Sequence, residues 1–355
     1  MGFCIILGAK IENNKIMFIS VKKAGVIVFV ITVALAFHCF IDCLCNRTAA
    51  PDYSISSTLP VAGLFAAPVL LVGGYRIVTD YLVTKYDEKA PRDPSTGILY
   101  GAGPMDLSPE NSPGAVLLIH GFVGTTNNFN DLPESLADAG WRVRAMLLPG
   151  HGTSPLDLLT VTADSLLSAV RQEYDTLKAD HKRVVIIGHS MGGTLSALIA
   201  AETDPDAIVL CAPYFGVTHK WYYGLTPETW TKLFAPVLRW VPKSDYFKKI
   251  NFKEVREDIV SYHWIPMKGV SAMMELGNRA NQTGLLGEID CPVLFIHSKG
   301  DDAAFWRDSE NAFERISSKD KRFVWLERSN HIIFWDYEKD VVTEEILGFL
   351  GGLPD

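Results

Sequence analysis

From about Gly114 onward, short apolar runs alternate with stretches in which apolar residues recur at helical spacing. The apolar runs predict strands at Ala115–His120, Arg142–Leu148, Arg183–Gly188, Ala207–Ala212, Pro292–His297 and Arg322–Glu327. The stretches with helical spacing predict helices at Asn128–Ala139, Ala163–Ala179, Met191–Glu202, Trp306–Ile316 and Asp336–Leu350. This alternation is typical of a mostly parallel sheet covered by helices on both faces. We therefore expect an α/β domain over residues 114–355.

The N-terminal region has a different pattern. Residues 24–41 are apolar apart from Thr32 and His38, which is about the length that a helix needs to cross a bilayer, roughly 20 residues. Lysines precede this segment, so its N-terminal end is expected in the cytoplasm. A cleavable signal is the alternative, but Ala34-Leu35-Ala36 lies inside the apolar run. We expect an uncleaved anchor in the cell membrane.

A second apolar segment, residues 59–75, is shorter and is interrupted by Pro60 and Pro68. It can complete a membrane hairpin, lie in the interface or dock on the folded domain. One span would place the C-terminal domain outside, and two would return it to the cytoplasm, which the basic residues after the segment favour. Residues 1–83 are thus predicted to be a tail and anchor region. Residues 84–113 are predicted to be a linker with a first strand at 97–102.

Composition excludes several classes of function. The chain of 355 residues has a net charge of −8 and no long stripe of Lys or Arg, which argues against a nucleic-acid partner. It contains neither a His-Glu-x-x-His pattern nor a paired Cys-x-x-Cys, so no metal site and no cofactor are predicted. The spacing of its six cysteines does not suggest a disulfide framework.

The hexapeptide Gly188-His189-Ser190-Met191-Gly192-Gly193 lies between a predicted strand and a helix of small residues. The chain must reverse within this hexapeptide, and the glycines lack the Cβ atoms that would clash in so tight a turn. Ser190 would then stand at the apex of a strained turn above the carboxyl edge of the sheet. We predict that Ser190 is a nucleophile.

A second glycine-containing loop, His120-Gly121-Phe122-Val123-Gly124, follows the first predicted strand of the domain. When a serine attacks a carbonyl, the developing negative charge on oxygen must be met by prealigned N–H groups. We predict that the backbone N–H groups of Phe122 and Met191 form this oxyanion hole. The simpler interpretation of the loop is a turn after a strand.

A serine nucleophile needs a base that can take its proton near neutral pH and return it to the leaving group, which favours histidine. Most of the nine histidines fit a structural position better than that of a base; His297, for example, lies within or at the end of an apolar strand. His331 lies in a polar loop between the last strand and the last helix, at the carboxyl edge of the sheet. We predict that His331 is the base.

The base in turn needs an acid that orients its ring. Asp301 and Asp302 follow the strand Pro292–His297, and the order Ser190, Asp301, His331 is the one expected for an α/β-hydrolase. We predict Asp301 as the third member, with Asp302 as the alternative.

The segment between Ala212 and Cys291 is too long for a simple crossover and is rich in aromatic residues. Residues of about 214–285 are predicted to form a helical cap over Ser190. An apolar roof would exclude water and bind an acyl chain, although most of these rings are expected to serve packing within the cap.

Taken together, the motifs around Gly121, Pro149-Gly150-His151-Gly152, Ser190, Asp301 and His331 resemble those of serine carboxylesterases and monoacylglycerol lipases of the α/β-hydrolase superfamily. The resemblance covers residues 115–350 and implies acylation of Ser190 followed by hydrolysis of the acyl-enzyme. Two departures loosen the substrate assignment: the acid loop lacks the Val and Pro that usually follow the aspartate, and Asn330 replaces the glycine often found before the histidine.

The expected protein is therefore a membrane-anchored α/β-hydrolase that cleaves short-to-medium acyl esters or monoacylglycerols, with a small ester or lipid as its partner. An acyltransferase or thioesterase with the same triad is the nearest alternative. A non-catalytic, membrane-bound lipid-binding module is the alternative from another class.

Overall fold

The computed structural model describes residues 55–218, 224–243 and 249–354, and the chain divides into two compact units, Met1–Val78 and Thr79–Asp355. Helix α2 (Ile55–Asp87) begins in the first unit and contains the apolar segment 59–75. The predicted anchor at 24–41 lies outside the described residues. Within the residues that are described, no helix is both long and apolar enough to cross a membrane.

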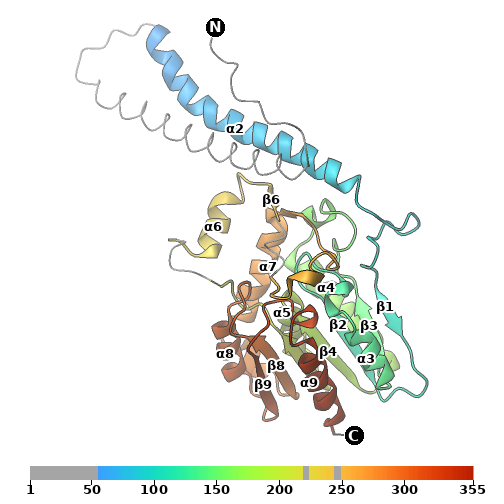
Figure 1. Ribbon diagram of the computed structural model, residues 1–355. Coiled ribbons are helices and arrows are strands. Elements are labelled where there is room, and N and C mark those ends of the chain that lie inside the picture. Colours follow the sequence, from blue (N-terminus) through green and yellow to red (C-terminus); the bar gives the residue numbers. More distant parts are fainter. Residues whose placement is uncertain (1–54, 219–223, 244–248, 355) are drawn as a thin grey trace. The chain divides into compact units, whose positions relative to one another are not determined.

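The second unit is built on a seven-stranded sheet with the order β1-β3-β2-β4-β5-β8-β9 (Figure 1). Strand β1 pairs with β3 in antiparallel orientation, and the other neighbours in this sheet are parallel. The strands are β1 (Met105–Leu107), β2 (Ala115–Ile119), β3 (Arg142–Met146), β4 (Val184–His189), β5 (Ala207–Cys211), β8 (Val293–Ser298) and β9 (Lys321–Leu326).

Helices cover both faces of this sheet, which explains why β2, β4 and β5 are buried along their whole length and are apolar apart from His189 at the end of β4. Successive side chains of a strand point to opposite faces. Leu117 and Ile119 of β2 therefore pack in one core cluster with α4 and α5, whereas Val116 and Leu118 pack in a second cluster with α3 and α9. The covering helices are α3 (Leu132–Asp138), α4 (Ala163–Asp180), α5 (Met191–Ala200), α8 (Trp306–Arg315) and α9 (Lys339–Gly351).

The predicted α/β fold is confirmed, but two local predictions are wrong. The first strand lies at Met105–Leu107 rather than at 97–102, where Gly97 and Gly101 have φ of 71° and 77° and turn the chain. The helix predicted at 128–139 is a 3₁₀ turn, η2 (Thr126–Phe129), followed by the short helix α3. Asn130 separates them because its φ of 49° is not helical.

The long segment between β5 and β8 forms a cap of mixed structure, which corrects the prediction of a helical cap. Its described elements are α6 (Pro227–Phe234), β6 (Trp240–Pro242), η6 (Lys253–Val255), β7 (Trp264–Pro266), α7 (Met267–Ala280) and η7 (Leu285–Glu288). The two Trp-x-Pro strands pair in antiparallel orientation, since a β-branched residue between Trp and Pro favours an extended chain.

Candidate active site

Ser190 stands at a tight turn between β4 and α5. Its backbone has φ 56° and ψ −121°, a conformation that strains any residue with a Cβ atom. The glycines are required by close approach: a Cβ on Gly188 would lie 2.3 Å from the carbonyl oxygen of Gly192, and one on Gly192 would lie 1.9 Å from that of Ile119. The N–H of Ser190 donates to the carbonyl of Cys211 at 2.9 Å, which ties the turn to β5. Ser190 thus has the strained strand-to-helix turn that the sequence predicts for it.

The structure brings Ser190, His331 and Asp301 into one hydrogen-bonded chain. His331 Nε2 lies 2.8 Å from Ser190 Oγ, and His331 Nδ1 lies 2.7 Å from Asp301 Oδ2. An ionised carboxylate can only accept, so the hydrogen of the neutral ring belongs on Nδ1 and the lone pair of Nε2 faces the serine hydroxyl. In this tautomer, His331 can accept the proton of Ser190.

The two adjacent aspartates of the acid loop have different surroundings. Asp301 is buried; its Oδ1 accepts the backbone N–H groups of Ala303 and Ala304 at 2.7 and 2.9 Å. Burial opposes ionisation of Asp301, but the charge and hydrogen bond of His331 and the hydrogen bond of His297 outweigh it, so the pKa of this carboxyl lies well below its ordinary value. Asp302 is exposed, and its backbone N–H donates to Asn330 Oδ1 at 3.1 Å. The geometry thus favours Asp301 as the partner of His331.

The loop after β2 lies directly against Ser190. A Cβ on Gly121 would lie 2.9 Å from the Cβ of Ser190, so only glycine allows this approach. The carbonyl of Gly121 accepts hydrogen bonds from the Gly124 N–H and from His120 Nδ1, which holds the loop in place. Phe122 follows in this loop, and Met191 is the first residue of α5, where the helix dipole favours negative charge. The two predicted oxyanion donors therefore each follow directly after one of the two residues, Gly121 and Ser190, that meet at this point.

Three further histidines surround the site in buried positions. Burial lowers the pKa of His151 to about 4 and that of His189, which lies beside His331, to about 3. The pKa of His120 is also well below its ordinary value, mainly because it is buried. His189 Nε2 lies 2.9 Å from the backbone carbonyl of His331 and therefore donates to it. These rings are neutral at physiological pH and support the loops rather than carry charge.

The loop that carries His331 is held by the cap. The N–H groups of His331 and Ile332 both donate to the carbonyl of Lys249 at 3.0 Å. Buried Asp336 accepts the N–H groups of Asn251 and Phe252 from the cap at 2.9 Å, and that of Asn330 from the histidine loop at 2.8 Å. The cap therefore holds the loop of His331 in place through these hydrogen bonds.

Sequence reasoning missed two of these contributors. The apolar pattern places His297 in a strand and gives it no role, yet its Nε2 lies 3.0 Å from Asp301 Oδ2. The signal was the spacing His-x-x-x-Asp across the end of a strand. For Asp336 the pattern indicates only the start of the last helix. Its role as a buried acceptor for amides far away in the chain had no local signal.

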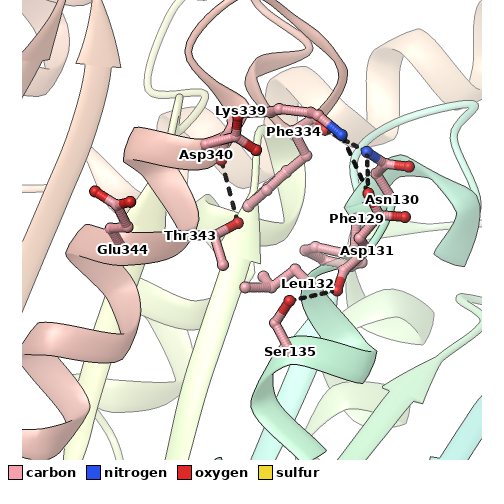
Figure 2. A pocket seen from close by; sticks show the side chains of 10 residues that line it. All are labelled: Phe129, Asn130, Asp131, Leu132, Ser135, Phe334, Lys339, Asp340, Thr343 and Glu344. Atoms are coloured by element: carbon pink, nitrogen blue, oxygen red, sulfur yellow. Dashed lines mark hydrogen bonds and ion pairs between the residues drawn. The ribbon is translucent and has the colours of Figure 1, made fainter. Parts of the chain in front are cut away.

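A cavity of about 370 Å³ opens between α3 and α9 (Figure 2). Charged groups line it, including an ion pair between Lys339 Nζ and Asp131 Oδ2 at 3.2 Å. Its inner wall includes Phe334, whose ring packs edge-on against His189. The cavity contains none of the predicted site residues, so it is not a candidate for the ester site.

Metal binding has no support in the part of the chain that the structure describes. Across residues 55–218, 224–243 and 249–354, no group of three or more His, Cys, Asp or Glu side chains is arranged to hold a metal ion.

Comparison with known sequences gives a consistent picture. The family model described as serine aminopeptidase, S33 (Hydrolase_4) matches residues 110–339. The chain is 30% identical over 262 residues to a thermostable monoacylglycerol lipase of Bacillus sp. (strain H-257), covering 71% of this chain and 95% of the lipase. It is 24% identical to a carboxylesterase of Bacillus subtilis (strain 168), covering 66% of this chain and 92% of that enzyme.

Solved structures agree on the fold. A structure from work on LipS and LipT, two metagenome-derived lipolytic enzymes, has a TM-score of 0.64 and 26% identity, and the match covers 72% of this chain and 99% of that one. A soluble variant of monoglyceride lipase from Saccharomyces cerevisiae has a TM-score of 0.63 at 19% identity, with 75% and 99% of the chains covered.

Proposed function

Because this chain belongs to the serine aminopeptidase S33 family of the α/β-hydrolases and is a carboxylesterase- or lipase-like serine hydrolase, we propose that it cleaves short-to-medium acyl esters or monoacylglycerols with Ser190 as nucleophile. The observation that carries the proposal is the hydrogen-bonded chain from Ser190 Oγ through His331 to Asp301, with distances of 2.8 and 2.7 Å.

In the first half of the reaction, Ser190 Oγ attacks the ester carbonyl carbon as its proton passes to His331 Nε2. The oxyanion accepts hydrogen bonds from the N–H groups of Phe122 and Met191. The bond to the alkoxy oxygen then breaks, and His331 returns the proton to this oxygen, which leaves as the alcohol. Asp301 stays ionised throughout and stabilises the imidazolium.

In the second half, water gives a proton to His331 and attacks the acyl carbon. The bond to Ser190 Oγ breaks, the serine regains the proton, and the carboxylic acid leaves. Water is the acyl acceptor in this scheme, and the names of two relatives, a monoacylglycerol lipase and a carboxylesterase, support an ester as substrate. With an alcohol or thiol in place of water as acceptor, the enzyme would be an acyltransferase. With a thioester in place of the oxygen ester as substrate, it would be a thioesterase.

The test is a series of p-nitrophenyl esters with acyl chains of increasing length, together with a monoacylglycerol. Wild type should release the free acid from each substrate within its range, and Ser190→Ala should reduce kcat by about 10⁶-fold. Product analysis with glycerol or a thiol present separates hydrolysis from acyl transfer. Turnover by Ser190→Ala at the wild-type rate would refute the proposal.

We also propose that residues 24–41 anchor the chain in the cell membrane. The support is the apolar run itself and the lysines before it. The full chain should remain in the membrane pellet after alkaline carbonate extraction, and Val30→Asp with Leu35→Asp should release it. Protease treatment of intact cells then reports the side of the catalytic domain, for which the charge pattern favours the cytoplasm. Equal extraction of both forms would contradict the anchor.

A further inference from the structure

Strand β8 brings a second histidine to the carboxylate of Asp301. His297 Nε2 lies 3.0 Å from Asp301 Oδ2, the same oxygen that His331 Nδ1 contacts at 2.7 Å. We propose that His297 is a positioning residue that acts through Asp301. Its N–H holds the carboxylate in place and partly neutralises the negative charge on Oδ2, the oxygen that contacts His331. The inference rests on the proposed catalytic triad and adds a residue that lies beyond it.

The proton positions follow from the acceptor. Because the ionised carboxylate can only accept, both His297 Nε2 and His331 Nδ1 must carry hydrogens. In the neutral ring, His297 Nδ1 is then an acceptor, and the hydroxyl of Ser309 lies 2.9 Å from it. His297 and Ser309 are both fully buried. A continuous chain thus runs from Ser309 in α8 through His297, Asp301 and His331 to Ser190.

The carboxylate is held at both oxygens. Ala303 and Ala304 donate their N–H groups to Oδ1, while the two imidazoles donate to Oδ2. Four donors prevent rotation of the carboxylate, so Oδ2 stays aimed at His331. Since two N–H groups share Oδ2, neither ring receives its full charge. Without His297, the charge of Oδ2 would act on the ring of His331 alone.

The other charged and titratable groups near the pair come from each neighbouring element. His189 from β4 faces the histidine loop and is neutral, because burial lowers its pKa to about 3. Asp302 is exposed on the acid loop, and Lys249 of the cap meets His331 through its backbone carbonyl. Asp308 of α8 lies against Gly216, where an added Cβ would be 2.0 Å from its carboxylate. The imidazoles that contact Asp301 Oδ2 directly are those of His297 and His331.

A buried histidine with both nitrogens satisfied can also be a purely structural part of the core, and glutamine separates the two roles. The side-chain amide nitrogen of glutamine corresponds to His Nε2 and can donate to Oδ2, whereas leucine fills the space without a donor. Phe295→Leu is the matched control, because this fully buried residue lies two positions earlier in β8 and packs on Phe313 and Phe323.

The experiment measures kcat, KM and the pH profile of kcat/KM on a p-nitrophenyl ester, together with the thermal midpoint. His297→Leu should lower kcat by about 10- to 100-fold with KM little changed, and should move the acid limb up by about half to one pH unit. His297→Gln should stay within about threefold of wild type with its acid limb in place. Phe295→Leu should lower Tm without moving the limb.

Folded His297→Leu with wild-type kcat and an unmoved acid limb would overturn the proposal, as would equal losses in the Leu and Gln variants with no shift of the limb. If the Leu variant does not fold, Ser309→Ala decides. Losing the hydroxyl that orients His297 should lower kcat several-fold and move the limb upward, and an unchanged profile overturns the inference. Ser190→Ala gives the baseline rate of ester hydrolysis. If wild type hydrolyses the ester no faster than this variant, the proposed function is refuted rather than the role of His297.

Discussion

Replacing Asp301 by asparagine exchanges one oxygen of a carboxylate that accepts four hydrogen bonds for an NH₂ group. Its two oxygens accept from Ala303 N, Ala304 N, His297 Nε2 and His331 Nδ1. An amide presents an acceptor on one side and an NH₂ donor on the other. The backbone N–H groups cannot reverse, so the amide oxygen should face Ala303 and Ala304, and the NH₂ group should face the two imidazoles.

The consequence for His331 is a change of tautomer. A donor at the position of Oδ2 requires a lone pair on His331 Nδ1, so the hydrogen moves to Nε2. Nε2 then faces Ser190 Oγ as a donor and cannot accept its proton. In a related serine triad the same change lowers kcat about 10⁴-fold, which corresponds to about 5.4 kcal/mol at 1.36 kcal/mol per factor of ten. We expect a loss of that size here.

The assay is hydrolysis of a p-nitrophenyl ester by Asp301→Asn and by Asp302→Asn, with circular dichroism to show that both are folded. Asp302→Asn is the matched control, because its side chain is exposed on the same loop, and its kcat should stay within about threefold of wild type. A folded Asp301→Asn that keeps more than a tenth of wild-type kcat would refute the reasoning. A large loss confined to Asp302→Asn would move the acid by one residue.

Further predictions concern stability. Gly192→Ala should lower the free energy of unfolding by about 3 kcal/mol or more, because the new Cβ would lie 1.9 Å from the Ile119 carbonyl oxygen. Gly348→Ala, with nothing within 4 Å of the added Cβ, should raise it by about 0.5–1 kcal/mol. Urea denaturation of the two variants checks the difference. Stability should fall as the pH drops below 6.5, because histidines of the unfolded chain take up protons while His151 and His189 stay neutral down to about pH 4 and 3; a thermal midpoint that is level from pH 6.5 to 4 would contradict this. Asp336→Ala leaves backbone amides of the cap and the histidine loop without their acceptor. Both kcat and the free energy of unfolding should therefore drop, the latter by about 3 kcal/mol. An unchanged kcat would mean that the cap does not position His331.

The sheet and the nucleophile turn could be predicted because their signals are local. Each central strand is an apolar run buried on both faces, and the glycines around Ser190 are demanded by contacts within a few residues or with the neighbouring strand. The order of Ser190, Asp301 and His331 along the chain followed from the topology, since all three follow carboxyl ends of parallel strands.

The parts that could not be predicted depend on contacts between distant segments. Whether Trp240–Pro242 forms a strand is decided by its partner Trp264–Pro266, which no local pattern reveals. The strand position of His297 is predicted correctly, but its function depends on Asp301 turning back over the end of β8. The choice between Asp301 and Asp302 likewise needed the direction of each side chain, which alternation along a loop does not supply.

The most direct test of the central claim, that Ser190 is the nucleophile of an ester hydrolase, is mass spectrometry of the full chain after reaction with a fluorophosphonate. We expect one adduct per chain, located on the peptide that contains Ser190, and a loss of ester hydrolysis in proportion to the labelling. His331→Ala should slow the labelling, because the hydroxyl loses its base. An adduct on another residue, or full ester hydrolysis by the labelled enzyme, would contradict the assignment of Ser190 as the nucleophile.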